Sequence, residues 1–76
     1  MNFGQALHEL KEGKHVTRSG WNGKKMFVYY VPEGFTEIDN KEVPTQPFIS
    51  MFTAQETSVP WLASQSDLLS EDWEVL

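Results

Sequence analysis

The chain lacks cysteine, so neither a disulfide nor a thiolate metal site can stabilise it. Its two histidines, His8 and His15, are too few for a closed structural zinc site without carboxylates. It also lacks an apolar run near the ~20 residues of a membrane span, and its first residues lack the order of a signal peptide. We therefore expect a cytoplasmic protein with no membrane partner, no metal and no cofactor.

Basic residues are scarce as well. Six Lys and Arg stand against 11 Asp and Glu, which gives a net charge of −5. A protein that binds polymeric nucleic acid needs a basic face to displace counterions from phosphates, so that class is excluded. A small phosphorylated ligand, which needs only one or two local donors, remains possible.

The chain is short. Its 76 residues are expected to form a single domain, 1–76. Domains below roughly 70 to 80 residues usually need a staple or a partner. Because cysteines are absent, self-association is the expected source of additional stability.

The N-terminal residues predict an amphipathic helix. Apolar side chains recur at helical spacing, at Phe3, Ala6, Leu7 and Leu10. Asn2 and Gln5 fit a capping box, and Gly13 suits the left-handed position past the helix end.

Short runs rich in β-branched and aromatic residues predict five strands, at Val16–Arg18, Lys25–Val31, Phe48–Thr53, Val59–Ser64 and Trp73–Leu76. Ser19–Gly23 and Ala54–Ser58 are expected hairpin turns, Ser66–Ser70 a helical turn, and Pro32–Pro47 a long irregular connection. The expected fold class is α+β: one N-terminal helix packed on a small antiparallel β-sheet. Met26–Val31 has no polar alternation, so a second copy is expected to cover its other face.

Motifs of the common enzyme classes are absent, including the phosphate-binding loop and the nucleophile elbow. His8 and His15 are interpreted as solvated surface residues. The C-terminal acidic residues, Asp67, Glu71, Asp72 and Glu74, allow acid–base work or magnesium binding, but a solvated face is the simpler interpretation.

The segment Arg18–Lys24 is richer than a turn requires. Trp21 offers a ring to stack on a base, Asn22 an amide to read its edge, and Gly23 and Arg18 donors for phosphate. The competing interpretation is a turn whose tryptophan folds onto the helix as core.

A second polar segment follows the fourth predicted strand. Ser64, Gln65 and Asp67 carry groups that can hydrogen-bond ribose or a base edge. Asp67 is equally suited to cap the helical turn that follows. Trp61 and Trp73, at strand positions, are interpreted as core.

Read together, these segments resemble the second Thoeris anti-defence family of bacteriophages. The resemblance rests on Asn2–Leu7, on Arg18 with Gly20–Lys24, and on Trp61–Leu69 followed by Glu71–Val75. It covers about residues 1–31 and 47–76. Lys25 stands where relatives commonly have a glycine, and Ala54–Glu56 replaces a frequent Asp-Gly turn.

The resemblance implies a non-catalytic protein that sequesters the cyclic ADP-ribose signal of bacterial TIR-domain enzymes, chiefly the glycocyclic isomer, in the cytoplasm of the infected host. It also implies a homotetramer, with pockets where protomers meet, and in some members a separate site for CBASS cyclic oligonucleotides. The ligand residues carried over are Arg18 as phosphate partner, Trp21, Asn22, Gly23, Phe27, Ser64, Gln65 and Asp67. Two alternatives stay open: a cyclic-nucleotide hydrolase or lyase using Asp67 with Glu71 or Asp72, and an acidic inhibitor of a host defence protein.

Overall fold

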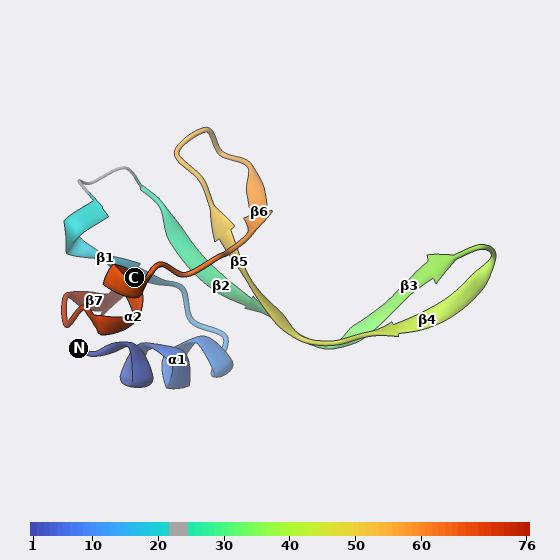
Figure 1. Cartoon of the computed structure of the whole chain (residues 1–76), viewed down its shortest axis with the longest axis horizontal. Coiled ribbons are helices and arrows are strands. Elements are labelled where there is room, and N and C mark those ends of the chain that lie inside the picture. The colour runs from blue at the N-terminus through green and yellow to red at the C-terminus, as the bar shows by residue number, and fades with distance from the viewer. Residues whose placement is uncertain (22–24) are drawn as a thin grey trace.

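The computed structural model describes residues 1–21 and 25–76 (Figure 1). In chain order the elements are α1 (Phe3–Lys11), β1 (Val16–Arg18), the 3-10 turn η1 (Ser19–Trp21), β2 (Phe27–Val31), β3 (Gly34–Ile38), β4 (Lys41–Thr45), β5 (Phe48–Phe52), β6 (Ser58–Pro60), α2 (Gln65–Leu69) and β7 (Trp73–Val75). Five strands form one antiparallel sheet in the order β6-β5-β2-β1-β7, and β3 and β4 form a separate two-stranded ribbon. The α+β prediction is confirmed. No helix within the described ranges is long and apolar enough to cross a membrane.

The helix α1 begins and ends as the sequence predicts. Asn2 Oδ1 accepts a hydrogen bond from the Gln5 backbone N–H at 2.9 Å, and Gln5 Oε1 accepts one from the Asn2 N–H at 2.9 Å. This reciprocal box satisfies two of the helix's unpaired donors. Gly13 follows the helix with φ 90°, a left-handed conformation that glycine adopts without steric cost.

The core lies between α1 and one face of the sheet. Its fully buried side chains are Ala6, Leu10, Val16, Val28 and Trp73. Val16 pairs with both Val28 and Val75, which places β1 between β2 and β7. The two predicted core tryptophans are both found there: Trp73 is 2% exposed, and Trp61 packs against the buried cluster.

The predicted strands are found, with shifted ends. The largest shift is in β6, which covers Ser58–Pro60 rather than Val59–Ser64. The Trp61 backbone N–H still donates to the Ile49 carbonyl of β5 at 2.9 Å, and the chain then turns into α2, whose N-cap is Ser64. The Ala54–Ser58 turn joins β5 and β6 as expected, with Glu56 at φ 61°. The turn predicted at Ser19–Gly23 is longer than a tight hairpin, because β1 ends at Arg18 and β2 begins at Phe27.

The prediction for Pro32–Pro47 was wrong. This segment is not irregular but forms the β3–β4 hairpin, which projects from the sheet as an arm (Figure 1). Asp39 and Asn40 form its two-residue turn at φ 51° and 63°, the positive pair that a hairpin of this length prefers. Pro44 is tolerated because each strand of a two-stranded ribbon has a free edge.

The sheet face opposite α1 carries the odd-numbered side chains of β2. Phe27 stacks on His15 at 4.3 Å and on Phe52 at 4.9 Å between ring centroids. Tyr29 and Val31 continue this face and, like Phe27, are only partly buried. The expectation that a second copy covers them stays a prediction.

Candidate functional site

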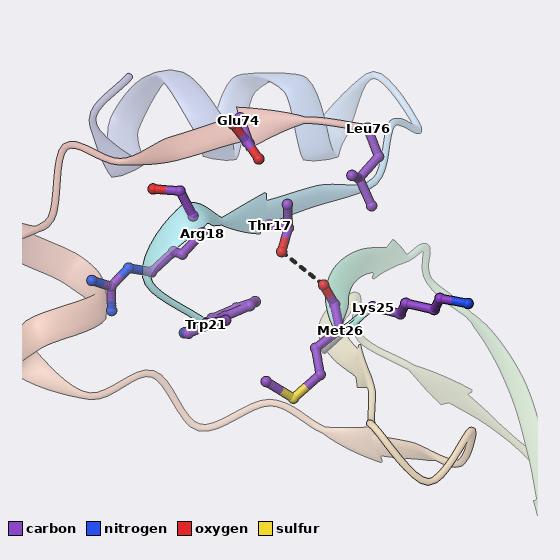
Figure 2. Close-up of a pocket in the computed structure, with 8 residues that line it drawn as sticks. Thr17, Arg18, Trp21, Lys25, Met26, Glu74 and Leu76 are labelled. Atoms are coloured by element: carbon purple, nitrogen blue, oxygen red, sulfur yellow. Dashed lines mark hydrogen bonds between the residues drawn. The ribbon is translucent and has the colours of Figure 1, made fainter. Parts of the chain in front are cut away.

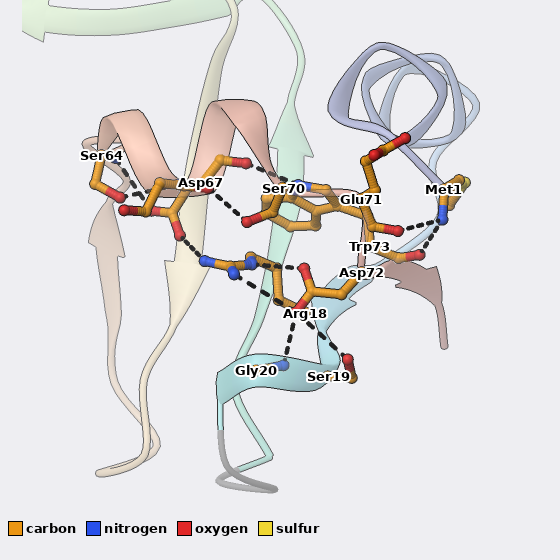
Figure 3. A network of polar contacts seen from close by, with 11 residues as sticks. Met1, Arg18, Ser19, Gly20, Ser64, Asp67, Ser70, Glu71, Asp72 and Trp73 are labelled. Carbon is orange, nitrogen blue, oxygen red and sulfur yellow. Dashed lines mark hydrogen bonds and ion pairs between the residues drawn. The ribbon is translucent and has the colours of Figure 1, made fainter.

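Arg18, the last residue of β1, connects this strand to α2 and to the start of β7. Arg18 Nη1 contacts Asp67 Oδ1 at 2.8 Å, and Arg18 Nε contacts Asp72 Oδ1 at 2.8 Å (Figure 3). The side chains of Arg18 and Asp67 are only 17% and 13% exposed. We call these three residues the Arg18 cluster. The Arg18–Asp67 pair is largely shielded from water, while the Asp72 side chain is 30% exposed, so the charged hydrogen bond to Asp67 is the better protected of the two.

Asp72 also holds the turn η1. Its Oδ2 accepts a hydrogen bond from the Gly20 backbone N–H at 2.9 Å, and its carbonyl oxygen accepts one from the Ser19 N–H at 3.2 Å. The Ser19 hydroxyl lies 3.4 Å from the same Oδ2. The sequence suggested that glycines here expose N–H groups to a phosphate, but the Gly20 N–H is bonded within the chain.

The second polar segment forms the start of α2. The Ser64 hydroxyl accepts from the Asp67 N–H at 3.0 Å, and Asp67 Oδ2 accepts from the Ser64 N–H at 3.1 Å. The capping interpretation of Asp67 is therefore correct in part, because Ser64 is the N-cap and Asp67, the third residue of α2, completes the capping box. Because its other oxygen bonds Arg18, Asp67 also connects α2 to β1.

Both carboxylates of the cluster have lowered pKa values. For Asp72 the main cause is the hydrogen bond from Arg18. For Asp67, burial acts to raise the pKa, but the Ser64 N–H, Arg18, the Ser64 side chain and Trp21 together outweigh it. The pKa of Arg18 is raised, chiefly by Asp72 and then Asp67. The cluster therefore stays fully ionised near neutral pH.

The depressed pKa values predict loss of stability in acid. A carboxylate whose pKa is lower in the folded state stabilises the fold above its unfolded pKa of about 3.9, and this contribution is lost as the pH falls through the folded pKa. We expect the unfolding free energy contributed by Asp67 and Asp72 to be constant near neutral pH and to fall below about pH 4. Urea unfolding across this range measures it. Asp72→Asn should flatten the acid limb, whereas an unchanged limb would contradict the assignment.

Trp21 ends η1 and has two environments. Its ring packs edge-on against Trp73, with centroids 5.3 Å apart, so the core interpretation is correct in part. It also lines a cavity of about 380 Å³ (Figure 2). The cavity lies beside β1, and its lining residues are Thr17, Arg18, Ser19, Trp21, Lys25, Met26, Glu74 and Leu76.

Of the other residues predicted for the site, those that the structure describes do not line the cavity with Arg18 and Trp21. Asn22 and Gly23 lie outside the described residues. Phe27 stands on the sheet face opposite α1 and is not among the described residues that line the cavity. Gln65 opens α2 and is exposed. The structure therefore places Arg18 and Trp21 at the cavity and joins Asp67 to Arg18. Ser64, Gln65 and Asp67 are not among the described residues that line the cavity, and Phe27 lies apart from it.

The residue that sequence reasoning missed is Asp72, which was interpreted as part of a solvated acidic run. Its role depends on the β1–β7 pairing, in which Arg18 lies opposite Trp73. The available signal was Arg18, an arginine in a predicted strand that needs a partner. The sequence does not show which carboxylate pairs with it.

The other chemistry-bearing residues have structural explanations. His8 is exposed and lies 3.6 Å from Glu12, while exposed His15 stacks on Phe27. Within 1–21 and 25–76, acidic residues and histidines form no group of three suited to a metal ion.

Lys25 has φ 57°, in the left-handed region. A glycine would adopt this positive φ without the steric cost that the β-carbon of Lys25 brings.

Comparison with known proteins identifies the family. The Tad2-like family model, described as a Thoeris anti-defense 2-like domain, matches residues 1–76 and so includes the segment 32–46, which the resemblance seen in the sequence had left out. The protein named Thoeris anti-defense 2 of Bacillus phage SP01 is 40% identical over 85 aligned residues, covering all of this chain and 94% of the relative. The chain therefore belongs to the family of Thoeris anti-defense 2-like domains.

Proposed function

We propose that this protein counters Thoeris immunity by binding and holding a cyclic ADP-ribose-type signal, preferably the glycocyclic isomer, without degrading it. Family membership supports the anti-defence role. The observation that carries the ligand class is the placement of Trp21 beside a 380 Å³ cavity, with the polar α2 cap linked to the same strand end through Arg18. An aromatic face with polar groups at its edge suits a nucleotide.

Holding a signal requires affinity and no transition-state stabilisation. The hydrolase alternative pairs Asp67 with Glu71 or Asp72. Asp67 and Asp72 both bond Arg18, and their pKa values are lowered. A general acid needs a pKa near the working pH, so this pair is poorly suited to that chemistry. The protein as proposed is a binding protein and not an enzyme.

The proposal includes a homotetramer in which a second protomer completes the pocket. A cavity of 380 Å³ is at the lower end of the range for small-molecule sites. The projecting β3–β4 hairpin carries Phe35 at 68% and Ile38 at 53% exposure, on opposite faces. A two-stranded ribbon is at best marginally stable alone in water, so contact with another copy would stabilise it. Binding of CBASS cyclic oligonucleotides at a separate site is part of the same proposal.

The decisive experiment tests release. The protein is incubated with glycocyclic ADP-ribose, freed of unbound ligand and heat-denatured, and the supernatant is analysed by chromatography and mass. We expect the signal to return intact and in a fixed ratio to protein. A degraded product, particularly one lost in EDTA or in Asp67→Ala, would establish the hydrolase alternative instead. Capture of a host polypeptide with no bound signal would favour the protein inhibitor.

A further inference from the structure

Asp72 links the two parts of the proposed binding site, the turn η1 that carries Trp21 and the capped start of α2. Its carboxylate accepts from Arg18 Nε at 2.8 Å and from the Gly20 N–H at 2.9 Å, and Arg18 Nη1 continues to Asp67 at 2.8 Å (Figure 3). We propose that Asp72 is a positioning residue for signal binding, which holds Trp21 at a fixed place relative to the α2 cap. This inference rests on the proposed function.

The first step is the link through Arg18. A guanidinium is planar, and its donors leave in fixed directions, so Nε and Nη1 can bond two carboxylates at once. Here they join the residue before β7 to the third residue of α2. The low exposure of Arg18 and Asp67 limits competition from water. The α2 cap is therefore fixed to the end of β1.

The second step is the link to Trp21. The turn η1 has only three residues, too few to fix its own orientation by helical hydrogen bonds. Two successive N–H groups, of Ser19 and Gly20, instead donate to the carbonyl and carboxylate of Asp72. Trp21 follows directly, so the orientation of its ring depends on these bonds.

Arg18 consequently has the same role. Two carboxylates surround its guanidinium, so the cluster carries a net negative charge and does not attract a phosphate. Arg18 acts on the signal through the positions of Trp21 and Asp67 and not as a direct phosphate contact. Affinity gained in this way comes from ordering the site before the ligand arrives.

The first test is Asp72→Asn, which keeps the side-chain shape and an acceptor for Gly20 but loses the charged pair with Arg18. We expect glycocyclic ADP-ribose to bind about tenfold more weakly by calorimetry. Exchange of the Gly20 amide hydrogen should also become faster. Glu71→Gln is the charge-matched control, because the Glu71 side chain makes no ion pair within the described ranges; its affinity should stay within about twofold of wild type.

Gly20→Ala tests the same link without changing any charge. An added Cβ would lie 2.9 Å from Asp72 Oδ2 and 3.4 Å from Arg18 Nη2, so the carboxylate must move. Gly20 is not at positive φ, so alanine suits its backbone. We expect weaker binding again. Gly4→Ala adds the same atoms in α1, 3.4 Å from Asn2 Oδ1, and should bind normally.

A further control must show that weaker binding does not result from lower protein stability alone. Val28→Ala removes buried core atoms that take no part in the Arg18 cluster, and it should lower Tm at least as much while leaving affinity unchanged. If Val28→Ala weakens binding equally, or if Asp72→Asn and Gly20→Ala bind like wild type, the inference is wrong. If Asp72→Asn does not fold, Gly20→Ala decides. If wild type does not bind the signal, the proposed function fails, and this inference fails with it.

Discussion

Trp21→Ala is expected to bind the signal roughly 100-fold more weakly. Stacking on an aromatic ring is worth about 1–3 kcal/mol per base, and among the described lining residues of the cavity beside β1 the aromatic one is Trp21. Loss of that ring at the upper end of this range gives the expected factor. Calorimetry or equilibrium dialysis with glycocyclic ADP-ribose measures it.

The variant also loses packing, because Trp21 contacts Trp73 edge-on at 5.3 Å. Its Tm should therefore fall moderately, while the oligomer mass stays unchanged. Trp21→Phe keeps an aromatic face and should retain most of the affinity. If Trp21→Ala dissociates into monomers, or if it binds like wild type, Trp21 is a core or interface residue and not the stacking platform.

Trp73→Ala is expected to cause the largest loss of stability in the chain. Trp73 is 2% exposed and contacts the rings of Phe3, Trp21 and Trp61 at centroid distances of 5.3, 5.3 and 5.8 Å. Its Nε1–H also donates to the Asp67 carbonyl at 2.9 Å. Replacing a buried tryptophan by alanine costs about 3–5 kcal/mol, a large part of the stability of a small domain.

Urea denaturation and thermal unfolding measure this loss, and the fall in Tm should exceed roughly 10 °C. Trp73→Phe retains a ring but loses the hydrogen bond, and it should be intermediate. Leu62→Ala is the control, since Leu62 is 94% exposed and its truncation should change the unfolding free energy by less than about 0.5 kcal/mol. A Trp73→Ala protein with nearly unchanged Tm would contradict the assigned core.

The parts of the fold that the sequence predicted are those set by local chemistry. The helix α1 is determined by a capping box, a stripe of apolar residues and Gly13, all within a short stretch of chain. The β3–β4 hairpin was missed because its turn residues, Asp39 and Asn40, are a weaker signal than Asn-Gly, and because Pro44 argued against a strand.

The residues of the candidate site stay a prediction, and the hydrogen bonds that connect them were not predicted from the sequence. Trp21, Ser64 and Asp67 were recognised from residue type and family resemblance. The partners of Arg18 were not, because they depend on strands far apart in sequence lying side by side, with β1 against β7. Local patterns contain no information on such pairings until the topology is known.

The projecting β3–β4 hairpin has a hydrodynamic consequence. The chain measures 43 × 26 × 22 Å and has a radius of gyration of 13.9 Å, whereas a compact domain of this length would have about 11 Å. A protomer of this shape diffuses more slowly than a sphere of equal mass. Column elution would therefore overestimate the mass of a free protomer, and the number of copies in the assembly should be counted by light scattering or native mass spectrometry.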